Sequence, residues 1–149
     1  KLSEKGVVPE HRHEDIYNLK QQKTKQIIEA SAQVRQEKIN LLRWLKDDKG
    51  MHVACFTNSI RETAHLMLEK TGILEHFELV LSNQDVVRAK PSPEGYLKVL
   101  DYFGTSPKQA VIVEDSPKGL EAAHASGCHV IAVKNPEDVQ ISLFAEFLE

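Results

Sequence analysis

Cysteine is scarce in this sequence, and long apolar runs are missing from it. Its 149 residues include two cysteines, Cys55 and Cys128, which lie far apart and form no C-x-x-C pair. This usage excludes a disulfide scaffold and predicts a reducing, cytoplasmic environment. No apolar run approaches the roughly 20 residues that a membrane-spanning helix needs. The sequence therefore predicts neither a disulfide-rich protein nor a membrane partner.

A strong excess of charge is also absent. The net charge is −3 at pH 7, and 41% hydrophobic residues with 6% aromatics is an ordinary globular composition. Residues 1–50 carry a net charge of +3 and residues 51–149 a net charge of −6. Neither half has the clustered basic patch of a nucleic-acid-binding protein, so we expect no nucleic-acid partner. The asymmetry indicates either two solvated surfaces or a basic half that leans over an anionic substrate.

The spacing of apolar residues changes near Gly50. Residues 13–45 follow a helical period, with a polar stretch at 29–33 that separates two helices and a stop signal at 47–50. After Gly50, short apolar strands alternate with amphipathic helices. The predicted strands cover residues 53–56, 77–81, 110–113 and 129–133, and the predicted helices cover 60–70, 93–103, 117–126 and 136–147. Continuously apolar strands separated by helices predict an α/β fold with a doubly wound parallel sheet.

Polar groups follow the predicted strands at the edge where open parallel sheets bind ligands. Thr57 and Asn58 follow the first strand, and Lys90 lies in the loop after the second. Glu114 and Asp115 end the third strand. A hydroxyl, an ammonium and two adjacent carboxylates should therefore converge at one edge, where they could hold an anion and a cation.

The loops after the first and second predicted strands predict an anion site. Ser59 and Glu62 have the spacing of a capping box, so the free N–H groups of the next helix would point to this edge beside Thr57. The alternative is that Thr57 and Ser59 only cap that helix. Lys90 precedes Pro91, which favours an extended, stiff loop. The alternative for Lys90 is an ordinary solvated lysine.

The acidic pair predicts a metal site. Glu114 and Asp115 offer two hard oxygen donors, and Mg²⁺ prefers one or two carboxylates together with waters and phosphate. The alternative is that Asp115 caps the helix that begins near Pro117. Adjacent acids at a strand end otherwise repel each other, which favours the metal.

In this order, the three elements resemble the haloacid dehalogenase superfamily of phosphatases. The resemblance rests on Thr57-Asn58, Lys90-Pro91-x-Pro93 and Glu114-Asp115-Ser116-x-x-Gly119. It is strongest to the branch with a helical cap, which includes β-phosphoglucomutase and similar sugar-phosphate enzymes. It implies a partial helical cap over residues 1–50 and an α/β core over residues 51–149.

The resemblance also implies roles for the site residues. Thr57 would bond phosphoryl oxygens beside Asn58, Lys90 would neutralise the phosphate, and Glu114 and Asp115 would hold Mg²⁺. The implied chemistry is phosphoryl transfer from a small phosphorylated metabolite to an aspartate and then to water.

One part of the family pattern is absent. The family's nucleophile lies in a D-x-D element on the central first strand, and no two aspartates here have that spacing. The sequence starts at Lys1, so we expect upstream residues to be missing. The expected function is a fragment of a Mg²⁺-dependent phosphohydrolase or phosphomutase, inactive as this chain. The alternatives are a non-catalytic anion- and metal-binding module and a receiver-like signalling domain.

The missing strand would lie between the strand that ends at Thr57 and the strand that ends at Glu114. These two strands would then pair directly, receive a strand from a neighbouring copy, or need the upstream residues.

Overall fold

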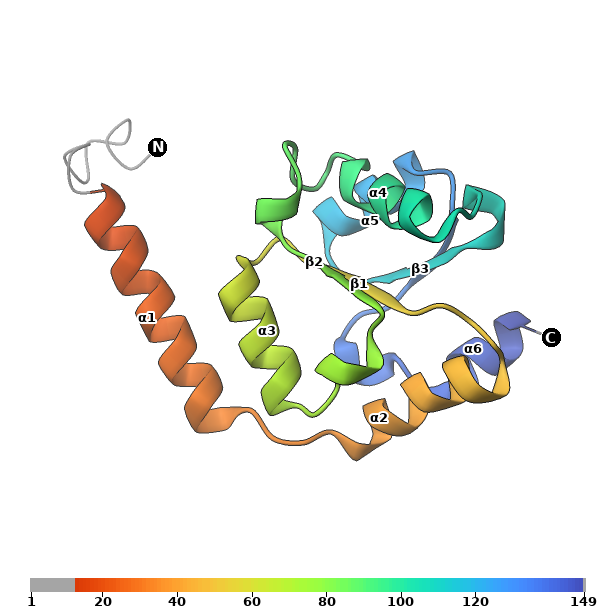
Figure 1. Cartoon of the computed structure of the whole chain (residues 1–149), viewed down its shortest axis with the longest axis horizontal. Coiled ribbons are helices and arrows are strands. Elements are labelled where there is room, and N and C mark those ends of the chain that lie inside the picture. The colour runs from red at the N-terminus through yellow and green to blue at the C-terminus, as the bar shows by residue number, and fades with distance from the viewer. Residues whose placement is uncertain (1–12, 149) are drawn as a thin grey trace.

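Two helices precede the first strand. A computed structural model describes residues 13–148, in which α1 covers His13–Ser31 and α2 covers Gln36–Arg43, followed by a π-helical turn at Trp44–Asp48 (Figure 1). The break between α1 and α2 falls slightly later than the polar stretch predicts. The predicted stop signal is confirmed, because the helical segment ends at Asp48.

The rest of the described chain alternates strand and helix, as the sequence predicts. The elements are β1 Ala54–Phe56, α3 Arg61–Lys70, β2 Leu79–Leu81, α4 Glu94–Phe103, β3 Val111–Glu114, α5 Pro117–Ala125, β4 His129–Ala132 and α6 Ile141–Leu148. Short 3₁₀ turns lie at Leu74–His76, Asn83–Asp85, Pro107–Gln109 and Pro136–Asp138. The final predicted helix is therefore split into a 3₁₀ turn and α6. No helix within residues 13–148 is long and apolar enough to cross a membrane.

The strands form two parallel pairs. β1 pairs with β2, with Cys55 opposite Val80, and β3 pairs with β4, with Ile112 opposite Val130. No ladder joins β1 to β3 in the described part of the chain. The α/β class with parallel strands is confirmed, and the gap between β1 and β3 agrees with the expectation that the central strand is missing from this chain. Of the three outcomes expected for these strands, direct pairing of β1 with β3 is wrong.

Helices cover the strands on both faces. α4 and α5 lie on one side of the strands, and α2 and α6 lie on the other (Figure 1). On the α2 and α6 side, Leu41, Leu45 and Phe144 form a buried cluster. On the other side, Tyr96 packs against Ala122 and Ala123. The residues of β1 and β3 are half-buried, and a cavity of about 600 Å³ lies against both strands.

The two N-terminal helices are anchored to different parts of the fold. α1 lies along α3, where Lys25 Nζ donates to Glu62 Oε1 at 2.6 Å. α2 is tied to the C-terminal segment, because Lys38 Nζ donates to the carbonyl oxygens of Pro136 and Val139, at 2.6 Å each. The domain boundary near residue 50 stays a prediction.

Candidate functional site

Lys90 lies where β1 and β3 end. Its Nζ donates to the carbonyl oxygen of Phe56, the last residue of β1, at 3.1 Å. It also donates to Oε2 of Glu114, the last residue of β3, at 2.8 Å. The ammonium lies 4.8 Å from the ring centroid of Phe56 and 5.1 Å from that of Tyr96, within reach of cation–π attraction. With 7% of its side chain exposed, Lys90 is a buried, paired lysine and not a solvated one.

Glu114 has both carboxylate oxygens engaged. Oε2 accepts from Lys90 Nζ and from the Tyr96 hydroxyl at 2.7 Å. Oε1 accepts from the backbone N–H groups of Asp115 and Ser116, at 3.2 Å each, and from the Ser116 hydroxyl at 3.0 Å. Burial raises the pKa of Glu114, but the bonds from Lys90 and Tyr96 outweigh it and lower the pKa to about 2. Glu114 is therefore a fixed carboxylate at neutral pH.

Tyr96 is a further site residue, which no local sequence pattern reveals. Burial, followed by the bond to Glu114, raises the pKa of the Tyr96 phenol well above its usual value, so the hydroxyl stays protonated and donates. Its ring meets that of Phe56 edge to face, with centroids 5.2 Å apart. In the sequence, an aromatic residue in the first turn of an amphipathic helix is indistinguishable from a core residue.

Two glycines make room for these side chains. A Cβ on Gly119 would collide with the Glu114 carboxyl group, and a Cβ on Gly95 would collide with the ring of Phe56. Gly119 belongs to the motif that carries the family resemblance, and its N–H donates to the Ser116 hydroxyl at 3.1 Å. Ser116 is thus the N-cap of α5, and the alternative that Asp115 caps this helix is wrong.

The loop after β1 differs from its predicted geometry. The Thr57 hydroxyl accepts from the N–H of Ser59 at 3.1 Å, but Ser59 does not cap the next helix. Ile60 stands at the N-cap, and the N–H of Arg61 donates to Gln84 Oε1 at 2.8 Å. The capping-box prediction is therefore wrong. Because β2 lies beside β1, the turn after β2 supplies Gln84 Oε1 as the acceptor at the start of α3.

Side-chain hydrogen bonds join three of the five predicted residues, Asn58, Lys90 and Glu114. Asn58 Oδ1 accepts from the backbone N–H of Lys90 at 3.2 Å, which ties the Thr57 loop to the lysine, and Lys90 reaches Glu114. Thr57 lies beside Asn58 in the chain, and Asp115 donates its N–H to Glu114 while its carboxylate is exposed.

The donor set for a metal ion is small. In residues 13–148, no group of three or more histidine, cysteine, aspartate or glutamate side chains could hold an ion. Glu114 already accepts on both oxygens, so Asp115 is the exposed carboxylate at this edge. Mg²⁺ often binds through one or two carboxylates with waters and phosphate, so these residues fit a weak Mg²⁺ site.

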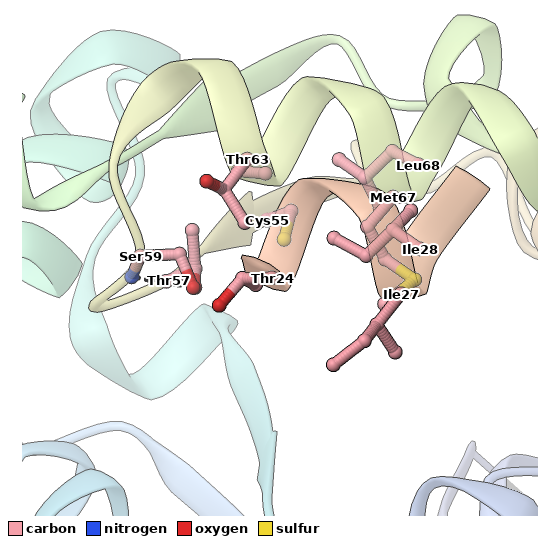
Figure 2. Close-up of a pocket in the computed structure, with 10 residues that line it drawn as sticks. Thr24, Ile27, Ile28, Cys55, Thr57, Ser59, Thr63, Met67 and Leu68 are labelled. Atoms are coloured by element: carbon pink, nitrogen blue, oxygen red, sulfur yellow. Dashed lines mark hydrogen bonds between the residues drawn. The ribbon is translucent and has the colours of Figure 1, made fainter. Parts of the chain in front are cut away.

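A pocket lies beside the Thr57 loop, between α1 and α3 (Figure 2). Its volume is about 370 Å³. It is lined by Thr24, Ile27, Ile28, Cys55, Thr57, Ser59, Thr63, Ala64, Met67 and Leu68. The apolar side chains come mainly from the two helices, whereas Thr57 and Ser59 lie at one end, as Figure 2 shows. The pocket can therefore take a small organic group next to the Thr57 loop.

The chain is similar to several phosphatases. It is 36% identical over 84 residues to a phosphoglycolate phosphatase of Thiobacillus denitrificans, which covers 56% of this chain and 37% of that protein. It is 43% identical over 61 residues to hexitol phosphatase A of Escherichia coli, which covers 41% of this chain and 28% of that protein. The chain thus spans less than half the length of these curated relatives.

A solved structure and a family model agree with these relatives. The crystal structure of a putative β-phosphoglucomutase from Thermotoga maritima superposes with a TM-score of 0.63 at 27% identity, over 74% of this chain and 52% of that one. Residues 2–133 match the model of haloacid dehalogenase-like hydrolases. This family match excludes the alternative that the chain is a receiver-like signalling domain. Since it covers most of the sequence, the chain belongs to the haloacid dehalogenase-like hydrolase family.

Proposed function

We propose that this chain is part of a Mg²⁺-dependent phosphohydrolase or phosphomutase that acts on a small phosphorylated metabolite. The observation that carries the proposal is the buried ammonium of Lys90 at the shared end of β1 and β3, within hydrogen-bond distance of both strands. The names of the phosphatase relatives support a phosphorylated substrate. In this proposal residues 1–50 are part of a helical cap and residues 51–149 are the α/β core.

Each site residue has a defined task in the proposal. The Thr57 hydroxyl accepts from Ser59 and keeps its own hydrogen for a phosphoryl oxygen. Asn58 holds the Lys90 loop in place, and Lys90 supplies positive charge to the phosphoryl group. Of the expected metal pair Glu114 and Asp115, Asp115 would be the direct carboxylate ligand of Mg²⁺, because Lys90, Tyr96 and Ser116 already hold Glu114. The ion when bound would neutralise charge on the phosphoryl oxygens.

The proposal includes inactivity of this chain by itself. The sequence has no D-x-D element, so no aspartate stands in the family's nucleophile pattern. We expect no phosphate release from a generic aryl phosphate with Mg²⁺. If the wild-type chain releases phosphate and Asp115→Asn does not, the proposal that this chain lacks the nucleophile is wrong.

Metal binding is tested separately from turnover. We expect Mg²⁺ to raise the melting temperature slightly, and Asp115→Asn to abolish that response. Asp101→Asn, an exposed carboxylate on α4, is the matched control and should leave the response unchanged. An equal Mg²⁺ response in wild type and Asp115→Asn would overturn the metal assignment.

The catalytic role of Lys90 is tested in a full-length homologue with the same motif. The lysine-to-alanine substitution should lower kcat more than it raises KM, because its charge matters most as the phosphoryl group transfers. A change confined to KM would contradict this role. A full-length homologue that binds phosphate and Mg²⁺ without turnover would favour the non-catalytic binding module.

A further inference from the structure

We propose that the pocket between α1 and α3 selects phosphate esters whose organic group is small, uncharged and apolar. The inference rests on the proposed function and names the substrate class for it. It is carried by the side chains that line the pocket, by the hydrogen bonds that its hydroxyl groups already make, and by its place beside Thr57.

The pocket has a polar end and an apolar end. Hydroxyl side chains gather at one end and larger apolar side chains at the other, as Figure 2 shows. The first set is Thr24, Thr57 and Ser59, and the second is Ile27, Ile28, Met67 and Leu68. The volume of about 370 Å³ lies in the size range of ligand sites. An ester whose phosphoryl group meets Thr57 would therefore place its organic group among the apolar side chains.

Charged side chains are missing from the lining, as far as residues 13–148 describe it. Lys25 and Glu62, which adjoin Thr24 and Thr63 in the sequence, bond each other at 2.6 Å. Cys55 adds no charge at neutral pH, because burial raises the pKa of its thiol. A carboxylate on the organic group would find no cation in the lining, and its loss of hydration would be costly.

The threonine hydroxyls of the two helices are engaged inside the protein. Thr24 Oγ1 donates to the carbonyl oxygen of Lys20 at 2.9 Å, and Thr63 Oγ1 donates to Oε1 of Gln21 at 3.3 Å. A hydroxyl has one hydrogen, so neither donates to a ligand as well. The Thr57 hydroxyl, in contrast, accepts from a backbone N–H and keeps its hydrogen. The lining thus offers a donor where the phosphoryl group would lie and withholds the helix hydroxyls from the organic group.

Two apolar side chains of the lining are exposed. Ile27 is 64% exposed and Met67 is 42% exposed, and they belong to the two helices that face each other. An apolar organic group would cover both side chains, and burial of apolar surface is favourable. Each methylene that the pocket buries should therefore raise the affinity about fourfold.

Matched phosphonates test the inference on the whole chain, because they keep the anionic head group and are not hydrolysed. Isopentylphosphonate and phosphonopropionate have nearly the same shape, with two methyl groups in one where the other has two carboxylate oxygens. Binding is followed by NMR on the methyl groups of Ile27, Ile28 and Met67 and on the amide of Thr57. We expect isopentylphosphonate to bind at least about tenfold more tightly than phosphonopropionate, and butylphosphonate to bind more tightly than ethylphosphonate.

A charge at the apolar end tests where the organic group lies. Ile27→Lys should weaken isopentylphosphonate binding and strengthen phosphonopropionate binding, each at least about fivefold, because the lysine can pair with the carboxylate. Leu19→Lys is the matched control. It adds the same charge to α1 at a position that is 54% exposed and outside the lining, so it should leave the ratio of the two affinities unchanged.

The remaining outcomes separate this inference from the proposed function. Phosphonates that shift Thr57 and bind equally well whatever their organic group would overturn the inference and leave the phosphate site standing. Isopentanol that binds as tightly as isopentylphosphonate, with no shift of Thr57 by either, would overturn the phosphate site and the inference with it. Equal effects of Ile27→Lys and Leu19→Lys on the ratio would show that the organic group lies outside the pocket, which also overturns the inference.

Discussion

The ammonium of Lys90 lies 2.8 Å from Oε2 of Glu114 and 3.1 Å from the carbonyl oxygen of Phe56, so it joins the ends of β3 and β1, which belong to different sheets. Their side chains are 7% and 10% exposed, so the pair is shielded from solvent. The pair is therefore both the centre of the candidate site and a bridge between the two halves of the fold.

Removing the charge of Lys90 should destabilise the chain strongly. Lys90→Met leaves the Glu114 carboxylate buried without its cation, and breaking a buried pair in this way costs about 3–5 kcal/mol. The free energy of unfolding from urea denaturation measures the loss. Lys108→Met, at an exposed position, is the control and should change the free energy of unfolding by less than about 0.5 kcal/mol.

A double-mutant cycle separates the ion pair from the loss of packing. Lys90→Met combined with Glu114→Gln should be more stable than Lys90→Met alone, because no unpaired charge remains. If the two substitutions have additive effects on the free energy of unfolding, Lys90 and Glu114 are not energetically coupled.

Gly119→Ala should destabilise the fold more than the same substitution at a glycine that has free space but a positive φ. The new methyl group would occupy the space of the Glu114 carboxyl, which Lys90 and Tyr96 hold in place, so the substitution should cost about 2–4 kcal/mol. Gly104→Ala is the comparison, because it has free space but a φ of +63°, and its strain should cost about 1 kcal/mol. A smaller loss for Gly119→Ala than for Gly104→Ala would contradict the packing around Glu114.

Asp85 should make the stability depend on acid pH. A hydrogen bond from the backbone of Ser82, followed by one from Arg61, lowers the pKa of Asp85 from 3.8 to about 2 despite burial. A carboxyl whose pKa is lower in the folded state stabilises the fold above its unfolded pKa. This contribution, about 2 kcal/mol at most, is lost as the pH falls from about 4 to about 2.

Asp85→Asn should therefore flatten the stability curve between pH 4 and pH 2, measured by urea denaturation at each pH. Asp101→Asn removes an exposed carboxylate and should leave that slope unchanged. The same slope in wild type and Asp85→Asn would show that Asp85 is not stabilised in the folded state.

Ser82→Ala should loosen the turn after β2. Ser82 is 1% exposed, its hydroxyl accepts from the N–H of Gln84 at 3.2 Å, and its own N–H donates to Asp85 at 2.7 Å. Loss of such a cap costs about 1 kcal/mol. Faster exchange of the Gln84 amide and a lower melting temperature would measure it. Unchanged exchange at Gln84 would contradict the cap.

Local sequence patterns predict the elements well and their contacts less well. Apolar runs and the residues that start or stop helices locate β1 through β4 and most helix ends, because these signals act within a few residues. The edge that gathers Thr57, Asn58, Lys90 and Glu114 also follows from sequence, since the carboxyl ends of parallel strands meet.

Features that depend on distant segments are not predictable in this way. Gln84 replaces Ser59 at the start of α3 only because β2 lies beside β1. Tyr96 reaches Glu114 across the gap between α4 and β3, and no local pattern announces that bond. The division into two sheets depends on which strands pair, which local patterns leave open.

The separate anchors of α1 and α2 determine how the pocket in Figure 2 can be reached. The Lys25–Glu62 pair that joins α1 to α3 is exposed at both ends and holds weakly. Leu41 of α2 is 3% exposed within the core. The N–H of Arg35 donates to the carbonyl oxygen of Thr71 at 3.0 Å, which ties the segment between α1 and α2 to the end of α3. Ile28 of α1 lines the pocket and is 4% exposed, so parting α1 from α3 would expose a core side chain. Apolar packing, more than the surface ion pair, therefore limits entry to the pocket between these helices.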